Sequence, residues 1–151
     1  MKKKGERYTV AVDFDGVLHS YTSPWMNART IPDPPVPGAI EWLAVMLGKF
    51  DVAITSTRNT QWLGKYAMRA WLRRHLYDYY WQIANASGRS WTHADVDDEA
   101  WIAARDAVWQ LKFPKHKPPA LIYLDDRAWR FRGPGTWPTA QEIHQARPWN
   151  K

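Results

Sequence analysis

The first apolar run of the chain, Tyr8 to Leu18, ends in two carboxylates and a glycine. Asp13 and Asp15 lie two residues apart, so their side chains point the same way for as long as the strand continues. Carboxylates this close repel each other, which favours protonation of one of them unless a cation lies between them. The spacing therefore indicates a divalent metal site, an acid/base carboxylate, or both.

Three apolar runs are predicted to be strands, and each ends in side chains that could take part in chemistry. Val10 to Val12 are apolar on both faces, as in a strand that is covered on both sides. The run at 50–55 leads into a hydroxyl-rich turn at 55–58, and the run at 120–124 is predicted to be a second buried strand that ends in paired acids. Ligands of open parallel sheets bind at the carboxyl ends of the strands, so we expect these groups to meet at one edge.

The segments between the strands are predicted to be mostly helical. Pro37-Gly38 opens a helix with apolar residues at i, i+3, i+4 and i+7, and Gly48 closes it, which predicts a right-handed parallel βαβ unit. The proline-rich stretch 19–37 is expected to be an irregular loop over the site. Further helices are predicted from Asn59 and from near Asp95 or Asp97, and a hairpin over 129–137.

The helix from Asn59 carries two stripes. The one expected to pack contains Leu63, Tyr66, Ala67 and Ala70. The basic stripe contains Lys65, Arg69 and Arg73, which is typical either of a solvated helix face or of a phosphate-backbone contact surface with aromatic residues nearby. At the other end of the chain, Thr139 and Glu142 predict a capping box for a last short helix that Pro148 ends.

The composition is typical of one globular domain over residues 1–151, with residues 1–7 as a flexible basic tail. Hydrophobic residues make up 45% and charged residues 24% of the 151 residues. The absence of Cys excludes disulfides and thiolate metal sites and is consistent with a cytoplasmic protein. No segment is suited to spanning a membrane, so no membrane partner is expected. The net charge of +6 favours phosphate-bearing partners, although Lys2 to Lys4 could simply be solvated.

Four acids are expected around one point at the carboxyl edge of the sheet: Asp13, Asp15, Asp125 and Asp126. Without Cys or paired His, this set favours a hard cation that binds oxygen, and Mg²⁺ in particular. A hydroxyl and a lysine beside such a cation indicate a phosphate. The combination suits phosphoryl transfer, in which positioning and charge neutralisation supply most of the catalysis.

These residues resemble the four motifs of the haloacid dehalogenase (HAD) superfamily, in the same order along the chain. The segment 13–18 resembles the first motif, 55–58 the second, Lys117-Pro118 the third and Asp125-Asp126 the fourth. The resemblance implies an α/β fold of the HAD-like (Rossmannoid) type, with three layers, a parallel central sheet and a minimal cap. It also implies a Mg²⁺-dependent phosphatase, a hydrolase that works through an aspartyl-phosphate.

The resemblance assigns a role to each motif. Asp13 would be the nucleophile, and Asp15 would protonate the leaving oxygen and then activate water. Mg²⁺ would be held by Asp13, the backbone carbonyl of Phe14 and Asp125, with Asp126 as a further ligand or as a residue that orients the others. Ser56 would bind a phosphoryl oxygen, and Lys117 would offset the negative charge.

Alternatives stay open at two of these positions. Thr55 could supply the hydroxyl in place of Ser56, whose spacing to Arg58 matches the common family form. Lys112 and Lys115 compete with Lys117, which is preferred because Lys-Pro before the last strand is the commoner pattern.

The substrate is expected to be a phosphorylated molecule, with nucleotides or nucleic acid phosphate ends favoured by the basic charge, the aromatic content and an open site. The chain lacks the room for a full cap domain between its first two motifs. The rival interpretation is a catalytically weak HAD-like module that binds nucleic acid or a protein partner.

Overall fold

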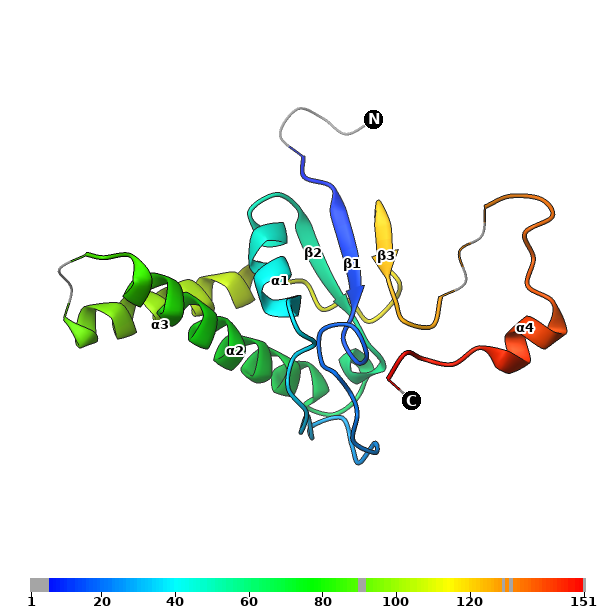
Figure 1. Cartoon of the computed structure of the whole chain (residues 1–151), viewed down its shortest axis with the longest axis horizontal. Helices are drawn as coiled ribbons and strands as arrows, with labels where there is room; N and C mark the ends of the chain where they lie inside the picture. The colour runs from blue at the N-terminus through cyan, green and yellow to red at the C-terminus, as the bar shows by residue number, and fades with distance from the viewer. Residues whose placement is uncertain (1–5, 90–91, 129, 131, 151) are drawn as a thin grey trace.

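Three parallel strands form an open sheet in the order β2-β1-β3. A computed structural model describes residues 6–89, 92–128, 130 and 132–150 of the chain. The strands are β1 (Thr9–Asp13), β2 (Asp51–Thr55) and β3 (Ile122–Leu124), and all three end at the same edge (Figure 1). The predicted α/β class with a parallel sheet is confirmed, whereas the HAD-like three-layer assignment stays a prediction.

The central position of β1 follows from its continuous apolar sequence. Val10, Ala11 and Val12 are all buried, as the apolar character of both faces predicts. Val10 is paired with Val52 and Val12 with Ile54, so these branched side chains share one face and pack in the core.

The helices are α1 (Ala39–Leu47), α2 (Gly64–Ala86), α3 (His93–Gln110) and α4 (Ala140–Gln145), with a 3₁₀ turn η1 (Thr57–Thr60) after β2. The predicted limits of α1 are confirmed: the helix begins after Gly38, whose φ is 81°, and ends before Gly48. The predicted capping box of Thr139 and Glu142 also forms and starts α4.

Helices α2 and α3 pair side by side and extend away from the sheet (Figure 1). The stripe predicted to pack on α2 was wrong for three of its residues, because Leu63, Tyr66 and Ala70 are exposed. The buried face instead carries Met68, Trp71, Leu72 and Leu76. The helix begins at Gly64, five residues later than expected. The sequence offers apolar residues on both faces of this helix, and packing against α3, α1 and η1 decides which face is covered.

The last third of the chain is less covered than predicted. Ile122 of β3 is 52% exposed, so the expectation of a second buried strand was wrong. Among the described residues, no helix packs extensively on this edge strand. The predicted hairpin over 129–137 lies partly outside the described residues, and its described part is a turn in which Thr136 N–H donates to the Gly133 carbonyl.

The predicted basic tail also lies mostly outside the described residues, at 1–5. Arg7, by contrast, donates from Nη2 to the carbonyl of Leu47 at the end of α1, at 2.6 Å. None of the helices in the described part of the chain has the length and apolar character that crossing a membrane requires.

Gly64 lies where the backbone of the chain packs closely against helix α2. A Cβ placed there would lie 2.3 Å from the carbonyl oxygen of Arg58 and 3.1 Å from Cβ of Ala28. We therefore expect Gly64→Ala to lower the free energy of unfolding by about 2–3 kcal/mol despite the better helix propensity of Ala. Urea unfolding checks this, with Gly48→Ala as the control. A Cβ at Gly48 meets its nearest neighbour at 3.4 Å, so that variant should stay within about 1 kcal/mol of the parent. Equal effects of the two substitutions would contradict the packing argument.

Candidate functional site

Three carboxylates converge where β1 and β3 end. Asp13, Asp125 and Asp126 each offer an oxygen atom, and these atoms lie within 4.8 Å of one another. The sheet explains the convergence: Val12 is paired with Leu124, so Asp13 and Asp125 follow neighbouring positions of parallel strands. Three of the four acids predicted around one point therefore lie together.

The cluster has the properties of a cation site. Both carboxylate oxygens of Asp126 are buried and have no hydrogen-bond partner among the described residues. Such atoms are costly to bury unless a cation or a proton is present. A Cβ at Gly16 would lie 2.5 Å from Oδ2 of Asp126, so a glycine, here with φ of 92°, lets the carboxylate approach. An all-oxygen donor set fits Mg²⁺ or another hard cation.

The electrostatics of the cluster agree with that fit. Burial, then the charge of Asp125, raises the pKa of Asp13 to about 7, with smaller increases from Asp126 and Asp15 that a hydrogen bond from the Phe14 N–H partly offsets. Burial also raises the pKa of Asp126. A bound cation would replace the protons that these carboxyl groups otherwise favour.

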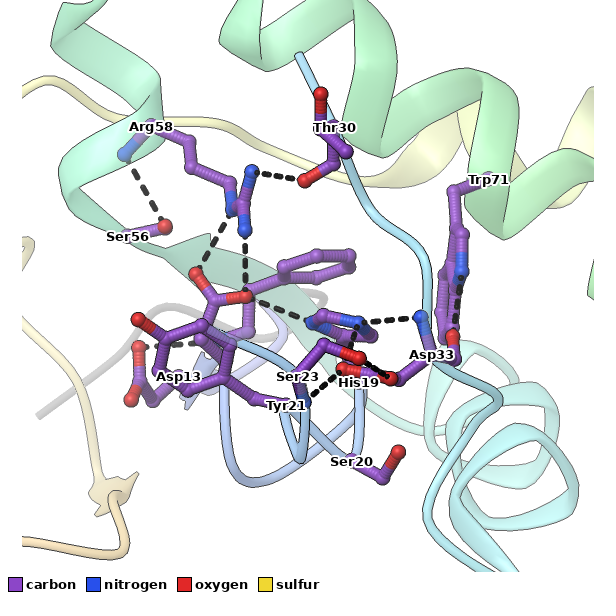
Figure 2. Close-up of polar contacts among 12 residues, drawn as sticks. Asp13, His19, Ser20, Tyr21, Ser23, Thr30, Asp33, Ser56, Arg58 and Trp71 are labelled. Carbon is purple, nitrogen blue, oxygen red and sulfur yellow. Dashed lines mark hydrogen bonds and ion pairs between the residues drawn. The ribbon is translucent and has the colours of Figure 1, made fainter. Parts of the chain in front are cut away.

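Asp15 is not part of this cluster, contrary to its predicted place around the metal. Its carboxylate accepts from Nε of Arg58 at 2.8 Å and from Nη2 at 3.0 Å, and it lies 2.8 Å from Nδ1 of His19 (Figure 2). Burial raises the pKa of Asp15, but these hydrogen bonds with His19 and Arg58 outweigh it and hold the pKa below its usual range. Asp15 is thus an ionised partner of Arg58.

The carbonyl of Phe14, predicted to bind the metal, accepts from the N–H groups of Leu18 and His19 at 3.1 and 2.9 Å. These bonds close the turn after β1 and occupy the carbonyl. In this structure the Phe14 carbonyl oxygen therefore stabilises the turn after β1.

Arg58 connects the site to the loop above it. Its side chain is 1% exposed, and Nη1 donates to the carbonyls of Asn27 and Ala28 at 3.2 and 2.9 Å. The same nitrogen donates to the carbonyl of Thr30 at 3.1 Å (Figure 2). Its guanidinium lies 4.5 Å from the ring of Trp25. The predicted irregular loop at 19–37 is confirmed, and Arg58 is what fixes it beside the site.

His19 is fully buried and bridges two parts of the same loop. The Asp33 N–H donates to Nε2 of His19 at 3.2 Å, so Nδ1 carries the hydrogen that bonds Asp15. Asp33 is held in turn by Ser23 and by Nε1 of Trp71, which donates to its carbonyl. The network fixes the direction of the Asp15 carboxylate.

A cleft of about 480 Å³ opens beside the carboxylates and contains the predicted phosphate ligand Ser56. Its walls are formed by acids, aromatic rings and polar side chains of several elements: Asp13, Asp15, Tyr21, Trp25, Ser56, Thr57, Gln61, Asp125 and Arg127. A second cleft of about 440 Å³ shares Asp13, Ser56 and Asp125 and adds Thr55. Ser56 lines both clefts and Thr55 only one, so Ser56 is the better placed of the two hydroxyls.

The three candidate lysines have different surroundings. Lys112 Nζ pairs with Asp51 at 2.7 Å, and its backbone bonds β2 at Val52 and Ile54, so it lies apart from the cleft. Lys115 and Lys117 both line the second cleft, and Nζ of Lys117 lies 4.2 Å from the ring of Tyr123. The structure therefore leaves Lys115 and Lys117 as the candidates.

Several residues of the site were missed by sequence reasoning. Arg58 served only as a spacing marker, and His19, Tyr21 and Arg127 were not considered. A signal existed for His19, because it lies four residues after Asp15. The chain end was also missed: Trp149 Nε1 donates to the Gly16 carbonyl and Asn150 Nδ2 to the carbonyls of Ser20 and Tyr21. No local pattern predicts these contacts.

Comparisons of the chain with models of protein families, with curated proteins and with solved structures found no match. The function is therefore argued from the geometry of this site.

Arg58 should be the side chain on which the site depends for stability. We expect Arg58→Ala to lower the free energy of unfolding by about 3–5 kcal/mol, because it leaves the Asp15 carboxylate and three loop carbonyls without their donor. The matched control is Arg89→Ala. The Arg89 side chain is 60% exposed and lies 4.0 Å from Glu99, so that variant should change stability by no more than about 0.5 kcal/mol. A loss below about 1 kcal/mol for Arg58→Ala in urea unfolding would show that the network is not supporting the fold.

Asp13 should make the metal-free protein less stable as the pH rises. Its folded pKa of about 7 lies above its ordinary value of 3.8, so stability present at low pH is lost as the pH rises through 7. In EDTA, Asp13→Asn should therefore gain stability relative to the parent between pH 5 and pH 8, by up to about 3 kcal/mol, which corresponds to the two pH units between 5 and the folded pKa of about 7. Urea unfolding at the two pH values measures this, and saturating Mg²⁺ should cancel the gain. A difference that does not change with pH would contradict the assignment.

Proposed function

We propose that this protein is a Mg²⁺-dependent phosphatase that forms an aspartyl-phosphate on Asp13. The observation that supports it is a cleft lined by Asp13, Asp125 and the hydroxyl of Ser56. Asp13 and Asp125 also form a carboxylate cluster with Asp126, whose buried oxygens lack hydrogen-bond partners among the described residues. Few other chemistries need a nucleophilic carboxylate next to a cation site and a hydroxyl that can bind phosphate.

In the first step, a carboxylate oxygen of Asp13 attacks phosphorus. The bond between phosphorus and the leaving oxygen breaks, and its electron pair goes to that oxygen. In the second step, water attacks the same phosphorus, the acyl-phosphate bond breaks, and Asp13 and inorganic phosphate are released. Bound Mg²⁺, held by Asp13, Asp125 and Asp126, would supply neutralising charge.

The other residues of the cleft bind and orient. Ser56 donates to a phosphoryl oxygen, and Lys115 or Lys117 offsets its charge. Asp15 borders the cleft, and its low pKa suits it to accept a proton from the attacking water more than to donate one to the leaving oxygen. Leaving groups that are stable without a proton should accordingly be released most readily.

The substrate class is a phosphate monoester, with a nucleotide or a nucleic acid phosphate end favoured. Trp25 and Tyr21 offer rings at the cleft, and Arg127 adds positive charge there. A cleft of about 480 Å³ has the volume of an ordinary small-ligand site.

The test is hydrolysis of p-nitrophenyl phosphate with and without Mg²⁺. We expect turnover only with Mg²⁺, and a loss of at least about 10³-fold in Asp13→Asn, because a nucleophile cannot be replaced by an amide. Asp98→Asn, an exposed aspartate on α3, is the matched control and should keep full activity. Activity retained in Asp13→Asn, or equal rates in EDTA, would contradict the proposal.

The rival function is a module of this fold that binds a polyanion without turnover. It is favoured by one observation: the acid/base candidate Asp15 is engaged by Arg58. Absence of hydrolysis at every Mg²⁺ concentration, with Mg²⁺ binding intact by calorimetry, would decide for this alternative.

A further inference from the structure

A separate concave site lies between α2 and α3, apart from the carboxylate cluster and from the two clefts beside it. It has a volume of about 370 Å³. Its walls combine basic and aromatic side chains of both helices: Tyr66, Arg69, Ala70, Arg73, Arg105, Val108 and Trp109. We call this the α2–α3 groove. Two residues of the basic stripe of α2, Arg69 and Arg73, therefore line this groove, and α3 adds a third arginine and a tryptophan, whereas Lys65 does not line it.

The aromatic rings of the groove are unusually open to solvent. Trp109 is 73% exposed and Tyr66 is 63% exposed. The guanidinium of Arg69 lies 5.3 Å from the ring of Trp109 and 5.5 Å from the ring of Phe113. An arginine held over rings in this way keeps its N–H groups available at its edge. The groove thus offers flat ring faces and directed donors together.

The charge of the groove is only slightly compensated. Arg69 and Arg73 take part in none of the ion pairs of the described residues. Arg105 pairs with its neighbour Asp106, but both side chains are about half exposed, so the pair is weak and exchangeable. A polyanion would therefore meet three arginines and one carboxylate.

The segment 113–117 connects the α2–α3 groove to the second cleft of the candidate active site. Phe113, which contacts Arg69, is followed by Pro114, Lys115 and Lys117, and these three line the second cleft together with Asp13. Asn59 fixes this segment, because its Nδ2 donates to the Pro114 carbonyl at 2.9 Å. A chain bound in the groove could continue along 113–117 toward Asp13.

We infer that the α2–α3 groove binds a single-stranded polynucleotide, with the arginines on its phosphates and Trp109 and Tyr66 against its bases. Arginines alone would accept any polyanion, whereas exposed rings contribute only when the ligand has free flat faces. A duplex keeps its bases stacked, and an acidic peptide has no such faces. That the bound polynucleotide places its terminal phosphate near Asp13 is a further inference, and it rests on the proposed phosphatase function.

Binding is tested by fluorescence anisotropy with a labelled 12-nucleotide single strand of mixed sequence, as DNA and as RNA. The groove variant Arg69→Gln/Arg73→Gln/Arg105→Gln is compared with Arg74→Gln/Arg89→Gln/Arg130→Gln, which removes the same charge from exposed arginines outside the groove. We expect the groove variant to weaken binding at least 10-fold more than the control. The slope of log K against log salt should fall by about 2, as three phosphate contacts on a single strand predict.

The rings give an independent measurement. Trp109→Ala should weaken single-strand binding about 5- to 100-fold without changing the salt slope. Circular dichroism confirms that each variant is folded. Equal weakening by the two triple variants, no effect of Trp109→Ala, or equal affinity for a duplex or for polyglutamate would overturn the groove as a single-strand site.

The same variants separate this inference from the proposed function. With a 3′- or 5′-phosphorylated oligonucleotide, the groove variant should raise KM at least 10-fold and leave the hydrolysis of p-nitrophenyl phosphate unchanged. Groove-dependent binding without any hydrolysis supports the groove and contradicts the phosphatase. Hydrolysis of both substrates that no groove variant affects supports the phosphatase and contradicts the groove.

Discussion

The buried ion pair between Asp15 and Arg58 is the interaction on which the rest of the site depends. A guanidinium that is 1% exposed must find an acceptor for almost every N–H, and here the acceptors are the Asp15 carboxylate and three carbonyls of the loop at 27–30. Removing any one partner leaves a charge or a carbonyl buried and unpaired, which costs more than the pair itself contributes. The loop is therefore fixed beside the cleft although it has no helix or strand of its own.

Two carboxylates of one short segment have opposite electrostatic properties. Burial, then the charge of Asp125, raises the pKa of Asp13 to about 7. Hydrogen bonds with His19 and Arg58 outweigh burial at Asp15 and lower its pKa. The partners are the acids that follow β3 on one side, and His19 with Arg58 of η1 on the other. Carboxylates two residues apart can thus take separate roles, one toward a cation and a phosphorus atom and the other toward a proton.

The sequence was informative where the determining contacts are local and less so where they are distant. The positions of β1 and β2, the ends of α1 and the capping box of α4 depend on neighbouring residues, and they were predicted. The convergence of Asp13 with Asp125 followed from the rule that parallel strands end together. The Arg58 network joins residues 43 positions apart, and the buried face of α2 depends on α3, so neither could be found from a local pattern. The exposure of Ile122 in β3 depends on which other elements cover the strand. The hydrophobic periodicity of the strand itself does not encode that.

The distribution of charge over the molecule links the binding of a divalent cation at the carboxylates to the binding of a phosphate chain in the groove. The groove and the segment 113–117 are basic and would attract a phosphate chain, but at their end the cluster of Asp13, Asp125 and Asp126 would repel it. A divalent cation in the cluster would turn this repulsion into attraction. Each ligand would then strengthen the binding of the other by the same factor, since coupling between two equilibria is reciprocal. On the proposed function, the arginines of the groove could concentrate the substrate, while the cation would decide whether its phosphate can reach Asp13.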